Sequence, residues 1–253
     1  MANVSQMGEG GGQIKRQGMG LVRDLWSGLL DLVYPPKCLV CGDMQPEYFC
    51  EACRAEIVFI QPPVCSRCGA PIQDGPCAEC FGIEYAFDAA RAVGVYDGPL
   101  REAIHQLKYS GHRVLAPVLG VFLVEHLRGR SGFIQRIGCI VPMPIHASRR
   151  RQRGFNQSAL LAAEVGRAFA LPVVERALIR THATRPQVDL PIEMRRENVE
   201  GAFQVAGADA VAGRSVLLID DVFTTGSTAD SAARALRDAG AREIHVLTLA
   251  RSV

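Results

Sequence analysis

The chain lacks several features that would place a protein in a common class at once. No apolar run approaches the ~20 residues needed to cross a bilayer, and the formal net charge is only +2. A G-x-x-x-x-G-K-[ST] phosphate loop is missing, and the run GEGGGQ fails G-x-G-x-x-G because Gln13 stands at the last glycine. We therefore expect neither a membrane span nor a P-loop ATPase, and any nucleic-acid-binding surface must be local.

The N-terminal segment predicts little packed structure. Residues 1–20 are polar and glycine-rich, which is typical of a disordered tail and unlike a signal peptide. Residues 21–35 place Leu21, Leu25 and Leu29 at helical spacing and predict an amphipathic helix. Because Arg23 is the single basic residue of that helix before the prolines, docking on the protein's own core is expected rather than membrane binding. We expect a cytoplasmic protein.

Cysteine is abundant, and its spacing indicates metal. Nine cysteines in a chain expected to be cytoplasmic indicate metal binding rather than disulfides, and eight of them fall in C-x-x-C pairs. The stretch CLVCGDMQPEYFCEAC at 38–53 recurs 27 positions later as CSRCGAPIQDGPCAEC at 65–80. Two C-x-x-C pairs complete a tetrahedral Cys₄ site. The predicted metal ligands are Cys38, Cys41, Cys50, Cys53, Cys65, Cys68, Cys77 and Cys80.

The repeat favours two sequential sites, and interleaved ligation is the alternative. Structural Zn²⁺, as one or two ions, is the usual occupant of such spacing, with iron–sulfur or redox use as the second reading. We assign residues 36–84 to a double zinc ribbon, which has few large apolar groups and would need metal to fold. Cys139, inside the apolar IGCIV segment, is expected in the core.

Residues 85–253 alternate between strand and helix patterns. This alternation predicts an α/β fold with a doubly wound parallel sheet, whose ligands bind outside the carboxyl ends of the strands. The predicted strands are 90–96, 137–142, 173–179, 215–220 and 243–250, and the predicted helices are 99–111, 114–128, 157–170 and 228–239.

Residues 216–228, VLLIDDVFTTGST, carry the strongest chemical signal. Four apolar residues predict a buried strand that stops on Asp220 and Asp221, and the hydroxyl-rich loop 224–228 then opens a helix. The loop's backbone N–H groups and the helix dipole form an anion site. Gly226 has no side chain, so a ligand can approach the backbone closely there. Carboxylates beside a phosphate accept hydrogen bonds from ribose hydroxyls or hold Mg²⁺. The stretch therefore predicts a sugar-phosphate site.

A cluster of arginines follows a second predicted strand. The segment VPMPIHASRRRQRGFNQS passes Pro142 and Pro144, which predict an extended or turning loop. Its candidate phosphate ligands are Arg149, Arg150 and Arg153, which sit beside Arg151. Arginine binds phosphate oxygens bidentately, so the cluster fits a pyrophosphate and a polynucleotide equally well, and a solvated face is the plain alternative.

The strand and loop at 216–228 resemble the phosphoribosyl pyrophosphate (PRPP) loop of class I phosphoribosyltransferases. In that family the acidic pair engages the ribose hydroxyls, and the loop wraps the 5′-phosphate. The resemblance assigns the catalytic role to Asp220 and Asp221. It assigns phosphate binding to Thr224, Thr225, Gly226, Ser227 and Thr228.

Several further motifs resemble one family, the ComF competence proteins. These are YPPKCLVCG, the double cysteine module, LKYSG at 107–111, RGFNQS at 153–158 and the polar stretch 180–203. The resemblance covers about residues 20–253. It implies a type I phosphoribosyltransferase fold with an N-terminal zinc module, PRPP with Mg²⁺ as ligand, and association with single-stranded DNA uptake beside a helicase-like partner.

Two functions fit these observations. The first is a phosphoribosyltransferase, with 180–200 as a lid or an inert loop and Lys108 as either a helper or a solvated side chain. The second is a non-catalytic protein that binds single-stranded DNA or a partner through the same fold. No motif identifies an acceptor, and His146 is the one histidine that lies close to the predicted pyrophosphate loop.

Overall fold

The computed structural model describes residues 36–73, 75–182, 199 and 201–252. The chain divides into two compact units, Met1–Cys50 and Glu51–Val253. The predicted tail, the predicted helix at 21–35 and most of the predicted lid at 180–200 lie outside the described residues. The predicted division at residue 84 stays a prediction.

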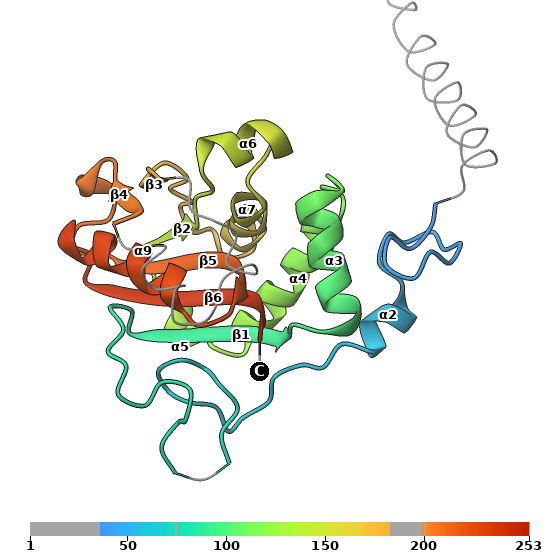
Figure 1. The fold of residues 1–253 in the computed structure, drawn as a ribbon, viewed down its shortest axis with the longest axis horizontal. Coiled ribbons are helices and arrows are strands. Elements are labelled where there is room, and N and C mark those ends of the chain that lie inside the picture. The colour runs from blue at the N-terminus through green and yellow to red at the C-terminus, as the bar shows by residue number, and fades with distance from the viewer. Residues whose placement is uncertain (1–35, 74, 183–198, 200, 253) are drawn as a thin grey trace, which may run out of the picture. The chain divides into compact units, whose positions relative to one another are not determined.

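Four parallel strands form the central sheet of the larger unit, as the alternating pattern predicted (Figure 1). They are β1 (Ala89–Val95), β2 (Cys139–Pro142), β5 (Ser215–Phe223) and β6 (Glu243–Arg251), in the order β1-β6-β5-β2. β5 and β6 are buried almost throughout because helices and loops cover both faces of a parallel sheet.

The sheet's two faces carry different layers. Val216 and Leu218 of β5 share one apolar cluster with Leu236 of α9 (Ser227–Asp238). Successive strand residues point to opposite faces, so Leu217 and Ile219 face the other layer. That layer contains α4 (Leu115–Arg128) and α7 (Gln157–Phe169), which pack on each other and on the sheet. The other helices among the described residues are α2 (Glu51–Ala55), α3 (Gly98–Tyr109), α5 (Ser131–Ile134), α6 (Ala147–Arg153) and the short 3₁₀ helix η2 (Ala208–Ala210).

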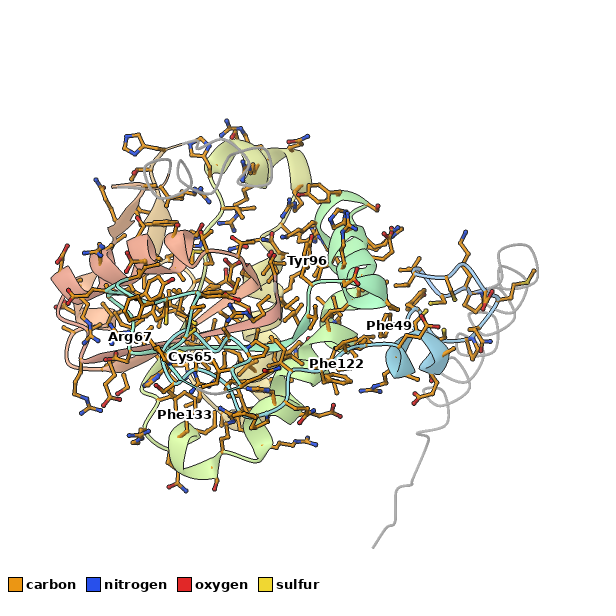
Figure 2. The ribbon with its side chains drawn as sticks, turned by 60° about the horizontal axis from the view of Figure 1, so that its bottom comes forward. Phe49, Cys65, Arg67, Tyr96, Phe122 and Phe133 are labelled. Atoms are coloured by element: carbon orange, nitrogen blue, oxygen red, sulfur yellow. The ribbon has the colours of Figure 1, made fainter. Side chains whose placement is uncertain are left out.

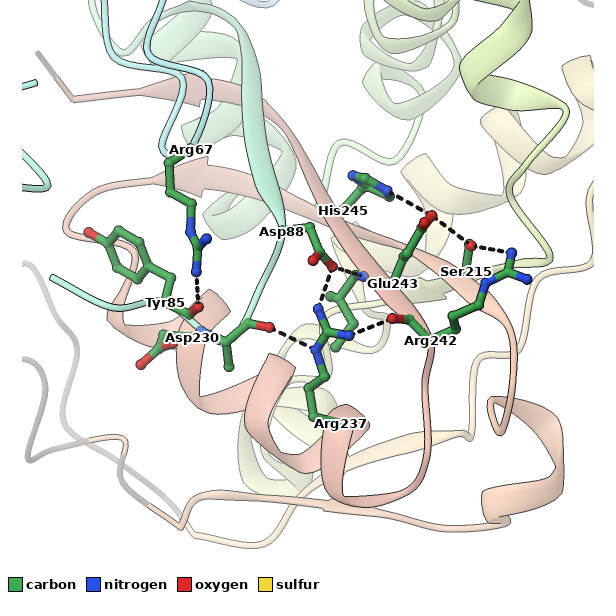
Figure 3. Close-up of polar contacts among 11 residues, drawn as sticks. Arg67, Tyr85, Asp88, Ser215, Asp230, Arg237, Arg242, Glu243 and His245 are labelled. Carbon is green, nitrogen blue, oxygen red and sulfur yellow. Dashed lines mark hydrogen bonds and ion pairs between the residues drawn. The ribbon is translucent and has the colours of Figure 1, made fainter.

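Polar contacts fasten α9 beside the start of β1 and β6 (Figure 3). Arg237 of α9 pairs with Asp88 and donates to the carbonyl oxygen of Ala86 at 3.1 Å. The Asp88 carboxylate also accepts from the backbone N–H of Ile244 at 2.7 Å. These bonds hold the C-terminal end of α9 against the segment that leads into β1.

The strand predicted at 173–179 is wrong in its extent. Only Val173 bridges β2, in parallel with Ile140, and a turn follows at 175–176. Glu175 and Arg176 are exposed at that turn, which interrupts the apolar run. The chain then enters β3 (Leu178–Arg180), which pairs antiparallel with β4 (Phe203–Val205) in a separate two-stranded sheet.

The second cysteine module lies against the central sheet (Figure 2). Cys65 and Cys68 belong to the same apolar cluster as Val216 and Leu218. The backbone N–H of Ala90 donates to the carbonyl oxygen of Arg67 at 2.7 Å. Gly69 has φ +73°, and a Cβ there would lie 2.4 Å from the Ala90 carbonyl oxygen. Glycine is therefore required for this close approach.

Candidate functional site

Asp221 is a buried carboxylate that α3 and α7 hold from two sides. Lys108 Nζ of α3 lies 2.5 Å from Asp221 Oδ1, and Gln157 Nε2 of α7 donates to Oδ2 at 2.7 Å. Burial opposes the charge on Lys108, but the Asp221 carboxylate outweighs it and raises the pKa of Lys108. Lys108 is therefore a structural partner of the acidic pair. Its position near a predicted helix end did not indicate that it would contact Asp221.

Asp220 carries a poorly compensated charge. Ser158 Oγ donates to Asp220 Oδ1 at 3.0 Å, and the backbone N–H of Asp221 donates to the same oxygen at 2.9 Å. Burial and the adjacent Asp221 charge raise the pKa of Asp220 to about 7. A carboxylate in this state favours the approach of a cation or of hydrogen-bond donors.

The loop 224–228 connects β5 to α9 beside these acids. Gly226 has φ +79°, and a Cβ there would lie 2.7 Å from Phe223 Cζ and 3.1 Å from Tyr85 Cε1. The Thr225 and Ser227 hydroxyls lie 2.8 Å apart, and the Tyr85 hydroxyl donates to the Thr225 carbonyl oxygen at 3.0 Å. The loop is thus packed from behind by aromatic rings, and α9 begins at Ser227.

A cavity of about 170 Å³ opens at this edge of the sheet. Its lining brings together Asp220 and Asp221 of β5, Thr224 and Thr228 of the loop, and side chains from α3, α6, α7 and β3. Strand ends, the loop and a helix N-terminus therefore meet at one concave surface, as expected for a parallel sheet. The other lining side chains include Tyr96, Lys108, Arg149, Arg153, Gln157 and Arg180.

The loop expected at Pro142 and Pro144 is present but short, and the arginines that follow it form helix α6. The His146 ring nitrogen Nδ1 accepts a hydrogen bond from the backbone N–H of Ser148 at 3.3 Å and so caps the helix. Arg149 and Arg153 are four residues apart, lie on one face and line the cavity. Arg150 falls on another face and is exposed, so the structure does not bring it to the cavity.

Residues of RGFNQS position the acids, a role that sequence analysis missed. Asn156 caps α7 by accepting from the backbone N–H of Ser158 at 3.1 Å, and its amide donates to the Met143 carbonyl oxygen at 3.0 Å. Gln157 and Ser158 therefore begin the helix with their side chains on Asp221 and Asp220. The available signal was an Asn-Gln-Ser sequence at a predicted helix start.

The eight paired cysteines gather into two groups of four, each with its sulfur atoms within 4.8 Å of one another. The Cys65–Cys80 and Cys68–Cys77 sulfur atoms are each 3.6 Å apart, and those of Cys41 and Cys50 are 3.7 Å apart. Zinc–sulfur bonds of about 2.3 Å in a tetrahedron give similar separations. The groups are Cys38, Cys41, Cys50 and Cys53, and Cys65, Cys68, Cys77 and Cys80.

The surroundings of two thiols favour the anionic form that binds metal. Burial favours neutral thiols, but backbone N–H donors outweigh it and lower the pKa of Cys38 to about 6 and of Cys65 to about 7. Thiolates are the form that ligates zinc. The donor set and its spacing therefore fit structural zinc, whereas Cys139 lies in the core.

Comparison with known proteins agrees with this organisation. A double zinc ribbon domain model matches residues 29–81, and a phosphoribosyl transferase domain model matches residues 156–252. "Competence protein F" of Haemophilus influenzae is 31% identical over 210 residues, which cover 80% of this chain and 90% of the relative. The chain belongs to the ComF family.

Two further relatives carry names that refer to DNA utilization or competence. "DNA utilization protein YhgH" of Escherichia coli K12 is 34% identical over 75% of this chain and 85% of the relative. "Competence protein ComFC" of Bacillus subtilis is 28% identical over 81% of this chain and 85% of the relative. Helices long and apolar enough to span a membrane are absent from the described part of this ComF chain.

Proposed function

We propose that this ComF protein binds PRPP with Mg²⁺ at the Asp220–Asp221 edge of the sheet and transfers or releases the phosphoribosyl group. The observation that carries this proposal is Asp220, a poorly compensated carboxylate beside a glycine-containing loop at a helix N-terminus. The match to a phosphoribosyl transferase domain over 156–252 supports it.

The proposed roles follow from position. Backbone N–H groups of 224–228 bind the 5′-phosphate, and Asp220 accepts hydrogen bonds from ribose hydroxyls. Asp221 is held by Lys108 and Gln157, so its charge fixes the Lys108 ammonium and adds to the negative potential at Asp220. Mg²⁺ fits the surplus negative charge of the pair and, when bound, neutralises pyrophosphate oxygens.

Arg149 and Arg153 supply charge for the leaving group. Transfer breaks the C1–O bond of PRPP: pyrophosphate leaves with the bonding electron pair, and C1 forms its new bond to the acceptor or, in release, to the oxygen of water. Guanidinium groups on one face of α6 stabilise that developing charge, because both line the same cavity as the acids. Arg150 is exposed elsewhere on α6 and is no longer part of this proposed set.

Calorimetric titration of PRPP with Mg²⁺ tests the proposal. Asp220→Asn should weaken binding by about 10- to 100-fold, the range for a lost hydrogen bond to a charged group. Asp221→Asn should also weaken binding, because Lys108 loses the carboxylate that holds it. Asp209→Asn removes an exposed carboxylate in η2 and is the matched control. Wild-type affinity in Asp220→Asn, with the fold intact by circular dichroism, would contradict the assignment.

A second candidate function is binding of single-stranded DNA without catalysis. Arg150 and Arg151 are exposed on α6, whose sequence contains no acidic residue. Surface arginines of this kind contact backbone phosphates. Binding of an oligonucleotide that survives in Asp220→Asn but falls in a double Arg150→Ser, Arg151→Ser variant would favour this function.

A further inference from the structure

A cavity of about 260 Å³ lies at the amino ends of the central strands. Ala89, His245 and Leu217 are aligned across β1, β6 and β5 near the starts of these strands, and all three line it. The proposed phosphate site lies at the carboxyl ends, and no described residue lines both cavities. Parallel α/β sheets usually bind ligands at the carboxyl ends. The fold by itself therefore does not account for this second cavity.

Positive charge gathers in the wall of this cavity. Arg91 comes from β1, Arg130 from the turn after α4 and Arg136 from the turn after α5. Burial and the nearby Arg130 charge lower the pKa of Arg91. None of the described lining residues is acidic, so the repulsion among these charges is not compensated within the wall. A bound anion would compensate it.

Two imidazole rings add polar atoms to the same wall. The Nε2 atoms of His126 and His245 are buried and make no hydrogen bond to any residue that the structure describes. Figure 3 shows His245 beside Glu243, at 3.5 Å from its Oε2, while that carboxylate accepts from the Ser215 hydroxyl at 2.9 Å. Buried polar nitrogens are nearly always hydrogen-bonded. The two rings therefore leave polar positions that a ligand can satisfy.

The Arg91 guanidinium is held in place with donors to spare. Its Nη1 donates to the carbonyl oxygens of Ser66 at 3.0 Å, Cys65 at 3.3 Å and Ala90 at 2.6 Å. All of its side-chain hydrogen bonds to described residues leave from Nη1. The Nε and Nη2 groups therefore keep their N–H donors for a ligand.

The rest of the wall is apolar. Phe133 of α5 (Figure 2) packs edge-on against the His245 ring, with 4.8 Å between the ring centres. Leu127 of α4 and Leu247 of β6 also line the cavity. An anion made only of oxygen atoms would leave these side chains without a partner, whereas an apolar body would bury them. The volume lies just below the range of about 300–1,000 Å³ typical of ligand pockets, so a small ligand fits.

We propose that this cavity binds a small organic anion, with a carboxylate or phosphate group on a short apolar or aromatic body. The guanidinium groups of Arg91, Arg130 and Arg136 bind the anionic oxygens, since their forked donors match both head groups. The two imidazole rings offer further polar contacts, and the apolar wall receives the body. The site is independent of the Asp220–Asp221 edge and does not rest on the proposed phosphoribosyl function.

Calorimetric titration of four probes into the full-length, zinc-loaded chain tests the ligand chemistry. Benzoate and phenyl phosphate carry both an anionic group and an apolar body, and at least one of them should bind saturably. Benzyl alcohol lacks the charge and inorganic phosphate lacks the body, so both should bind more weakly. Saturable binding of neither benzoate nor phenyl phosphate overturns the proposal. So does benzyl alcohol or inorganic phosphate that binds as tightly as they do.

Four variants locate the bound probe. Arg130→Gln should weaken binding of the acidic probe by about 10- to 100-fold, the range for a lost hydrogen bond to a charged group. Ala89→Leu fills the cavity and should weaken binding while all the arginines remain. Arg128→Gln removes an exposed arginine at the end of α4 and is the matched control. Asp220→Asn should also bind the probe as wild type does.

The fold of each variant is checked by circular dichroism, and Arg91 is left unchanged because it contacts the Cys65 carbonyl oxygen. Wild-type affinity in both Arg130→Gln and Ala89→Leu overturns the proposal. A loss in Asp220→Asn instead would place the probe at the phosphate site and would also overturn it.

Discussion

The Tyr85 hydroxyl donates a hydrogen bond to the Thr225 carbonyl oxygen at 3.0 Å, across 140 positions of the chain. Tyr85 stacks on Phe87, and Phe87 meets Phe223 edge-on. These rings share an apolar cluster with Cys65 and Cys68 of the second cysteine group. The proposed phosphate loop therefore rests on the same core as the second metal site.

Tyr85→Phe should loosen the loop without removing its aromatic support. One neutral hydrogen bond contributes about 0.5–1.5 kcal/mol, so a loss of that size is expected in the free energy of unfolding. Amide hydrogen exchange at 224–228 should accelerate relative to wild type, while exchange in β2 changes little. Unchanged exchange in the loop would show that the hydroxyl does not restrain it.

Zinc removal should affect the two cysteine groups separately. The full chain should hold two zinc ions, and Cys41→Ser and Cys68→Ser should each remove one, measured by mass spectrometry under native conditions. The Cys68 variant should also speed exchange at 224–228, because Arg251 donates to the Cys68 carbonyl oxygen at 2.7 Å and lies 5.4 Å over the Phe223 ring. Folded protein with well under one zinc per chain would contradict a structural role.

Lys108→Met should leave the Asp221 carboxylate buried without its cation. Breaking one side of a buried ion pair costs about 3–5 kcal/mol, which urea unfolding would measure. The double variant Lys108→Met, Asp221→Asn should recover part of that loss because the unpaired charge is gone. If the losses in the free energy of unfolding of the two single variants add up to the loss of the double variant, Lys108 and Asp221, whose contact is 2.5 Å, are not an energetically coupled pair.

His126 should make the protein sensitive to acid. Burial, with Arg130 and Arg91 nearby, lowers the pKa of His126 to about 4, and its Nε2 has no hydrogen-bond partner among the residues that the structure describes. The unfolded chain binds this proton near pH 6.5, so stability is full above that pH and falls as pH drops toward 4. His126→Gln should reduce this acid-induced loss in the free energy of unfolding by about 1–3 kcal/mol. Parallel pH–stability curves for the two proteins would refute this.

The sequence by itself determined the local elements and the chemistry that contiguous residues share. Continuous apolar runs and period-3.6 patterns are local, so the parallel strands and most helices of 89–251 were predictable. The 27-residue repeat predicted four-cysteine groups because a C-x-x-C turn places two sulfurs together whatever surrounds it. Asp220, Asp221 and the loop 224–228 are likewise close in the chain, so their shared chemistry was predictable. The ComF motifs are contiguous stretches and could be identified without the structure.

Only the tertiary structure decided which distant side chains meet. Lys108 reaches Asp221 because α3 and β5 converge, and nothing near Lys108 in the sequence specifies that partner. Whether Arg149 or Arg150 faces the cavity depends on the helical phase of α6, which the prolines before it obscured. Tyr85 beneath the loop and Tyr109 beside it come from other segments, since packing between elements follows no sequence period.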